Sequence, residues 1–178
     1  MATKKWVIDP THSEIQFKVK HLMITNVTGS FDKFEASVET EDEDFMKAKI
    51  SFTADIDSIS TGNEQRDGHL KSADFFDAPN FPQLKFVATK YENVDNDGSY
   101  ELYGDLTLKG TTKNIKLDVE FGGVVKDPYG NTKAGFTING KIKRKDFGLH
   151  WDVITEAGGV VVSDEVKLAC EIQLIEQQ

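Results

Sequence analysis

The chain has a single cysteine, fewer basic than acidic residues and no long apolar run, and each shortage excludes a class of protein. Cys170 cannot form an internal disulfide, and its apolar position in a strand-like segment indicates a buried, inert thiol. No segment approaches the roughly 20 apolar residues of a membrane-spanning helix, so we expect no membrane span. The 21 basic against 30 acidic residues give a net charge of −9, which repels nucleic acid and anionic lipid headgroups at long range. We therefore expect no nucleic-acid partner.

The length and composition are typical of one soluble globular domain. Domains usually span about 100–200 residues, so the 178 residues suit a single domain over residues 1–178. Apolar residues make up 38% of the chain and charged residues 29%, a balance that suits a soluble fold. The first residues, MATKKWVIDP, contain two lysines but no apolar stretch after them, unlike a secretory signal. We therefore expect a cytoplasmic protein.

Apolar and polar residues alternate along eight segments, which is the period of a strand with one buried face. The segments are Ile15–His21, Phe34–Val38, Ala48–Ile56, Leu84–Ala88, Tyr100–Leu108, Ile115–Phe121, Ala134–Ile142 and Val166–Leu174. Turn-forming residues separate several of them, at Glu41–Asp44, Asp95–Gly98 and Asp127–Asn131. Eight antiparallel strands of this kind form either a closed barrel or a two-sheet sandwich. Long strands joined by short hairpins favour the eight-stranded barrel, because closure removes exposed edge strands.

One stretch, from Thr61 to Pro82, breaks the alternation. Thr61 and Glu64 match a capping box, with Thr61 as the N-cap, and predict a short helix near residues 62–73. Three aromatic residues follow that have no polar group to satisfy and need burial, namely Phe75, Phe76 and Phe81. A helix with trailing aromatics would close one end of the barrel, so the fold class is all-β with one short helix.

The apolar face decides whether the barrel is filled or hollow, since eight strands allow either. Aromatic residues alternate there with small ones such as Ala36, Ala88, Ala134 and Gly140, which favours a hollow lumen; a packed core of large and small side chains is the alternative. A lumen with hydrocarbon walls would bind a long, apolar, mostly uncharged ligand. The residues expected to contact it are Phe17, Val19, His21, Phe52, Ala54, Leu70, Phe75, Phe76, Phe86, Gly104, Leu106 and Phe136.

Four segments in order resemble the YceI-like family. They are WVIDPTHSEIQFKVKH, RDGHLKSADFFDAPNFP, GDLTLKGTTKNIKL and KRKDFGL, and together they extend over nearly the whole chain. The resemblance implies an extended lipocalin-like β-barrel that binds a polyisoprenoid lipid in its interior. A quinone tail or a polyprenyl phosphate would then be the bound lipid, with no other cofactor.

The polar residues of the helical stretch allow two interpretations. Arg66, Asp67, His69 and Asp74 could form an acid–base site, or an ion-pair network that holds the helix on the barrel. No nucleophile elbow, phosphate loop or dinucleotide motif accompanies them, so we expect the network, no catalytic residues and no enzyme. An enzyme that acts on a lipid substrate through Arg66, His69 and Asp74 is the alternative. The histidines, at positions 12, 21, 69 and 150, lack metal-site spacing, so we expect no metal.

A basic cluster lies at Lys141, Lys143, Arg144 and Lys145. It is either an exposed face or an attraction for a phosphorylated headgroup at a barrel mouth. The headgroup candidates are Arg66, His69 and Arg144. The leading hypothesis is a non-enzymatic carrier or store of an isoprenoid lipid, and an interaction protein with a filled core is a further alternative. The oligomeric state is left open between a monomer and a homodimer.

Overall fold

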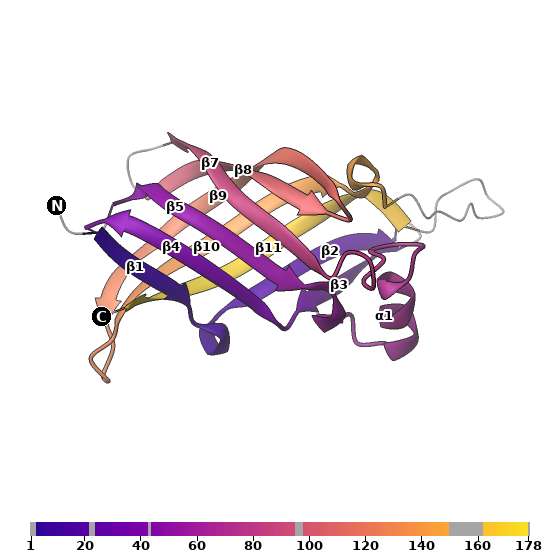
Figure 1. The fold of residues 1–178 in the computed structure, drawn as a ribbon, viewed down its shortest axis with the longest axis horizontal. Coiled ribbons are helices and arrows are strands. Elements are labelled where there is room, and N and C mark those ends of the chain that lie inside the picture. The colour runs from indigo at the N-terminus through magenta and orange to yellow at the C-terminus, as the bar shows by residue number, and fades with distance from the viewer. Residues whose placement is uncertain (1–2, 22–23, 43, 95–97, 150–161, 178) are drawn as a thin grey trace.

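The strands of the computed structural model form one antiparallel sheet that curls into a barrel (Figure 1). The structure describes residues 3–21, 24–42, 44–94, 98–149 and 162–177, so His150 and parts of two expected turns lie outside it. The strands are β1 (Thr3–Ile8), β2 (Glu14–His21), β3 (Thr25–Phe31), β4 (Phe34–Glu41), β5 (Asp44–Asp55), β6 (Ile59–Ser60), β7 (Gln83–Asn93), β8 (Ser99–Leu108), β9 (Thr111–Lys126), β10 (Thr132–Lys143) and β11 (Val162–Gln177).

Eight strands close into a ring, which confirms the antiparallel eight-stranded barrel. The order around the ring is β1-β4-β5-β7-β8-β9-β10-β11, and β1 pairs with β11 to complete it. The other three strands extend from this ring as β2-β3-β6. Strand β11 connects the two parts, since Leu174–Gln177 pairs with β1 whereas Val162–Glu171 pairs with β2.

The membership of the ring differs from the prediction at one strand. The predicted first strand is β2, which lies outside the ring, and β1 takes its place. Strand β1 has six residues, and its buried side chains are Trp6 and Ile8, which is too short an alternation to recognise. The two strands are separated by a single 3-10 turn, η1 (Pro10–His12), where the chain changes partners along β11.

A charged cluster fixes that turn against β10. The carboxylate of Asp9, which is 6% exposed, accepts from Thr11, lies 2.8 Å from Nδ1 of His12 and 3.0 Å from Nζ of Lys133. Lys133 also lies 3.5 Å from Asp127 in the β9–β10 hairpin. The cluster therefore ties the break between β1 and β2 to a strand far away in the sequence.

The helix α1 (Glu64–Lys71) lies at one end of the barrel (Figure 1). Its N-cap is Asn63, whose side chain accepts from the backbone N–H of Arg66 at 3.0 Å, so the assignment of Thr61 as N-cap is wrong. Asparagine caps helices at least as well as threonine and here directly precedes the first turn. In the part of the chain that the structure describes, no helix is long and apolar enough to cross a membrane.

Aromatic side chains close the opposite end of the barrel, where β1 begins and β11 ends. Trp6, Phe45, Phe121 and Phe136 form this aromatic plug, with ring centroids 5.1 Å apart for Trp6–Phe45 and 5.0 Å apart for Phe45–Phe136. The indole N–H of Trp6 donates to Oγ1 of Thr40 at 2.9 Å, which satisfies its one buried polar atom. The two ends of the barrel are therefore covered differently. The aromatic plug, from strands of the barrel, covers one end, and the segment that contains α1 covers the other.

Glycines in the strands make room for large side chains of the neighbouring strand. A Cβ added to Gly104 would overlap the ring of Phe86 and lie 2.7 Å from the carbonyl oxygen of Val87. Gly140 faces Leu117 in the same way. The expectation that these two positions leave the lumen empty is therefore wrong, because a side chain from the adjacent strand already covers each of them.

Replacing Gly104 with alanine should lower the free energy of unfolding by about 1–3 kcal/mol, as overpacking does in other cores. The matched control is Gly135→Ala, since a Cβ there would meet no atom within 4 Å and neither glycine has a positive φ. Equilibrium unfolding in urea measures both variants. Equal free energies of unfolding for the two variants would show that Phe86 and the β7 backbone move to accommodate the new methyl group without loss of stability.

Candidate functional site

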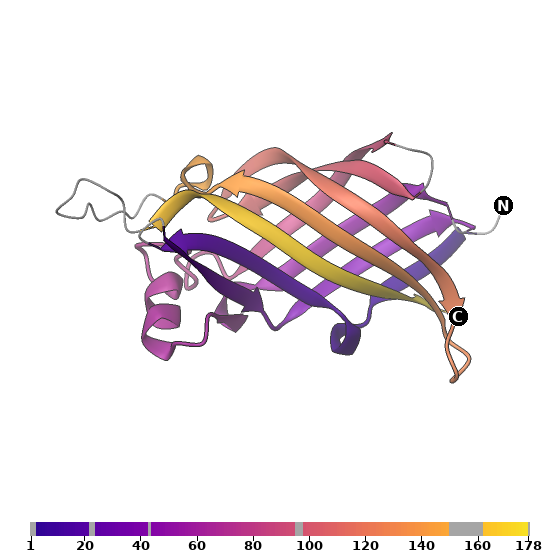
Figure 2. The ribbon, with the colours of Figure 1, turned by 180° about the vertical axis from the view of Figure 1, so that it is seen from behind.

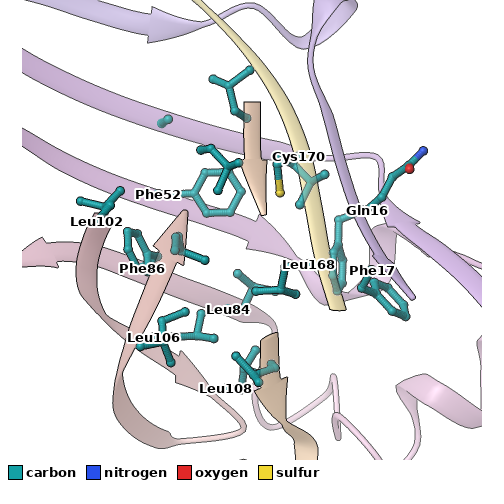
Figure 3. Close-up of a pocket in the computed structure, with 18 of the residues that line it drawn as sticks. Gln16, Phe17, Phe52, Leu84, Phe86, Leu102, Leu106, Leu108, Leu168 and Cys170 are labelled. Carbon is teal, nitrogen blue, oxygen red and sulfur yellow. The ribbon is translucent and has the colours of Figure 1, made fainter. Parts of the chain in front are cut away.

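The barrel encloses a cavity of about 250 Å³ between the aromatic plug and the α1 segment. Figure 3 shows its wall, with Leu102 and Leu106 of β8 and Leu168 and Cys170 of β11 pointing inward. The barrel is therefore hollow rather than filled by its own side chains. The volume lies just below the roughly 300–1,000 Å³ of pockets for drug-sized ligands.

Most of the residues predicted to line the lumen do so. The nine that do are Phe17, Val19, Phe52, Leu70, Phe75, Phe76, Phe86, Leu106 and Phe136. The period-two alternation placed the six on strands correctly, because inward side chains of a barrel strand must share one parity, and the other three follow from the helix and its trailing aromatics. Their contact with a ligand stays a prediction.

Three predicted residues are not part of the cavity wall that the structure describes. His21 ends β2 on its exposed side, and Ala54 is 1% exposed but is packed within the core. Gly104 is covered by Phe86. Parity alone does not reveal that a large neighbour can cover a small residue, and this is the reason for the error at Gly104.

Sequence reasoning missed part of the wall, including Ile8, Phe31 and Leu149. Phe31 packs on Phe17 with ring centroids 5.6 Å apart and meets Phe76 edge-on at 6.2 Å. A signal for it exists in the alternation of Val27, Gly29 and Phe31, although the threonines and serine between them weaken it.

The segment after α1 contributes aromatic side chains to the cavity, as expected. Phe75 and Phe76 line it at this end of the barrel, together with Leu70 from α1 itself. Phe81 differs, because it is half-buried over Gly110 in the β8–β9 turn and is not part of the wall. Two aromatics of this segment therefore close the cavity, and the third attaches the segment to a hairpin.

The polar residues of the α1 segment bond to groups nearby in the sequence, and whether they hold the helix on the barrel stays a prediction. Arg66 donates to the side chain and the carbonyl of Thr61, both at 2.7 Å, and Asp67 accepts from the backbone N–H of the same Thr61 at 2.9 Å. Nε2 of His69 lies 2.9 Å from Oδ2 of Asp74, and the His69 ring meets Phe75 edge-on. Arg66 and His69 are not among the described residues that line the cavity.

Arg144, in the 3-10 turn η3 (Arg144–Phe147), brings a positive charge to the apolar wall. It is 3% exposed, and its guanidinium donates to the carbonyl oxygens of Ser163 at 2.9 Å and Leu149 at 2.6 Å. Among the lining residues that the structure describes, no other side chain carries a formal charge. The described wall therefore carries its formal charge at this one point.

Cys170 contributes a thiol to the wall. Burial raises the pKa of its thiol to about 11, so the thiol is protonated at neutral pH. This agrees with an inert thiol rather than a nucleophile. Within the described ranges, no three His, Cys, Asp or Glu side chains come together as a possible metal site.

Comparisons with known proteins agree with this architecture. The crystal structure of a YceI protein from Campylobacter jejuni is 38% identical in sequence, with a TM-score of 0.75, over 90% of this chain and 91% of that one. A polyisoprenoid-binding domain from Saccharophagus degradans, implicated in plant cell wall breakdown, shares the fold at 15% identity, with a TM-score of 0.64 over 97% and 98% of the two chains.

The family assignment rests on the sequence. A UPF0312 protein of Staphylococcus aureus strain MSSA476 is 39% identical over 163 residues, which are 91% of this chain and 92% of that protein. The model of the YceI-like domain matches residues 6–174, a range that includes almost the whole barrel and its cavity wall. The chain therefore belongs to the YceI-like family.

Proposed function

We propose that the protein binds a long apolar isoprenoid lipid, a quinone tail or a polyprenyl phosphate, inside the barrel as a non-catalytic carrier or store. The cavity carries the proposal, because its described wall is almost entirely hydrocarbon and aromatic. The family assignment and the fold shared with a polyisoprenoid-binding domain support the class of ligand. A cytoplasmic location stays a prediction, and the oligomeric state stays open between a monomer and a homodimer.

The apolar burial is sufficient to hold such a chain. Each CH₂ removed from water contributes roughly 0.8 kcal/mol, so one five-carbon isoprene unit contributes about 4 kcal/mol before the costs of ordering. A few units are therefore enough for tight binding. Strong affinity with little dependence on salt is the expected signature, since the interaction does not rest on exposed charges.

Arg144 gives the bound lipid a direction. A buried guanidinium favours an oxygen-rich group nearby, as phosphates and carbonyls are. It lies at the α1 end of the cavity, between Leu149 and Ser163, whereas the aromatic plug at the other end is apolar. The proposed orientation thus places the headgroup near η3 and the tail toward the plug.

Organic extraction of the purified protein followed by mass spectrometry tests the function. An isoprenoid lipid that co-purifies and is unchanged after incubation supports the proposal. Chemically altered lipid would favour the alternative, an enzyme that acts on a lipid substrate. A protein that carries no lipid and does not bind a prenylated fluorescent probe would overturn it.

Cys170 should report on the occupancy of the lumen. With a pKa of about 11, its thiolate fraction at pH 8 is on the order of 0.1%, so a neutral maleimide should react about a hundredfold more slowly than with the unfolded chain. Adding the prenylated probe should slow the reaction further, because Cys170 lines the cavity. Mass spectrometry of the adduct measures the rate, and a rate unaffected by saturating probe would contradict binding at this position.

A further inference from the structure

Three lysines stand side by side on the outer face of the barrel. Lys18 of β2 pairs in register with Lys167 of β11, which pairs with Lys141 of β10, and all three are exposed. The three strands run next to one another across the view in Figure 2. Directly opposed residues on neighbouring strands have Cβ atoms about 4.5–5.5 Å apart, and like charges there destabilise a sheet. The fold thus keeps an arrangement that costs it stability.

Two more exposed lysines continue this surface toward the α1 end. Lys20 and Lys143 each follow a member of the row by two positions and so share its face. We call Lys18, Lys20, Lys141, Lys143 and Lys167 the lysine face. Glu165 lies within it, 3.7 Å from Lys141. Among the described residues, the other four lysines of the face have no acidic group within 4 Å.

The charge reverses along the same three strands toward the aromatic plug. The next outward row is neutral, with Gln16, Ala169 and Asn139 in register. The row after that contains Glu14 opposite Glu171. The net charge of −9 is therefore spread unevenly along these strands, which are positive beside α1 and acidic farther toward the plug, at Glu14 and Glu171.

An apolar side chain projects beside the lysine face. Ile24, just before β3, is 79% exposed. Lysines around an exposed aliphatic residue are typical of surfaces that bind anionic membranes, where the side chain enters the headgroup layer and the ammonium groups meet phosphates.

We propose that the lysine face docks the barrel, α1 end first, on an anionic phospholipid surface. A membrane fits the charge pattern better than a nucleic acid does. A nucleic-acid duplex lying along the strands would meet the carboxylates of Glu14 and Glu171. A membrane surface that touches only the α1 end avoids them. The uneven charge also orients the molecule at a distance, although its net charge is negative. This inference goes beyond lipid binding in the lumen and does not depend on it.

The test uses the full chain and vesicles that contain no isoprenoid. Wild-type protein should co-sediment with vesicles of equal parts phosphatidylcholine and phosphatidylglycerol, but not with pure phosphatidylcholine. The triple variant Lys18→Gln, Lys141→Gln, Lys167→Gln should bind at least about tenfold more weakly. The matched control, with the same change in net charge, is Lys47→Gln, Lys49→Gln, Lys126→Gln on exposed residues outside the face, and it should bind like wild type.

A single variant gives a second measurement that a purely structural role would not produce. Lys167 stands between two lysines, so Lys167→Gln should raise Tm by about 1–3 °C while it weakens vesicle binding. The proposal is overturned if both triple variants lose binding equally, if wild type does not distinguish the two vesicles, or if duplex DNA of equal phosphate concentration binds as tightly as the anionic vesicles. Because the vesicles lack isoprenoid, each of these outcomes is independent of the lumen.

Discussion

Replacing Cys170 with tryptophan is expected to abolish lipid binding while the barrel remains folded. Cys170 lies in register between Ile138 and Ile15, and its side chain faces the cavity (Figure 3). The indole would take the space of at least one isoprene unit, whose burial contributes about 4 kcal/mol. Affinity for a prenylated probe should therefore fall by at least about a hundredfold. Fluorescence titration measures the affinity, and Tm on the same sample measures the fold.

Two further variants make the result specific. Val87→Trp adds the same ring to a position on the outer face that is 49% exposed, and it should leave affinity and Tm unchanged. Ala54→Phe should destabilise the protein instead, because Ala54 is buried in the core and is not part of the described cavity wall. A folded Cys170→Trp protein with undiminished affinity would show that the lipid binds elsewhere.

Replacing Asp9 with asparagine is expected to lower the free energy of unfolding by about 2–3 kcal/mol at pH 7. The change keeps the size of the side chain but removes the charge that His12 and Lys133 meet at 2.8 and 3.0 Å. Urea unfolding at equilibrium measures the loss. Asp57→Asn is the matched control, because it makes the same chemical change at an exposed residue.

The loss should depend on pH in a defined direction. Burial alone would raise the pKa of Asp9, but hydrogen bonds from His12, Lys133 and Thr11 hold it well below its usual value. A carboxyl whose pKa is lower in the folded chain than in the unfolded chain, where it is about 3.9, contributes its full stability above that pH. As the pH falls below about 4 this contribution is lost, so the two proteins should converge. A constant difference between pH 7 and pH 3 would mean that shape rather than charge matters at Asp9.

Much of the barrel could be predicted because the same pattern, apolar residues inward and polar residues outward, repeats along the chain. Every long strand must direct alternate residues into the lumen, and this alternation appears wherever a strand has at least three inward positions, as in Tyr100–Leu108. Strand β1 has two buried positions and gave no such signal. The length of an element therefore limited what the pattern could reveal.

The remaining features depend on register, which one sequence does not specify. The pairing of neighbouring strands decides which residues stand opposite each other. It places Phe86 over Gly104, and it brings three lysines into one row, namely Lys18, Lys167 and Lys141. The charge cluster at Asp9 likewise needs Lys133, which is distant in sequence. In the α1 segment the residue types were recognised, but not that Arg66 and Asp67 would both bond to Thr61.

The shared pairing of β11 also governs how the chain reaches its native state. The ring closes where Lys5 meets Gln177, two residues 172 positions apart, and β2 has its β11 partners at a similar separation. Contacts between residues so distant in sequence carry a large loop-closure entropy and slow folding. Before β11 docks, the apolar face of the sheet and the edges of β1, β2 and β10 all face water. Folding should therefore be slow for a protein of this size, and its intermediates should aggregate unless the last strand is in place.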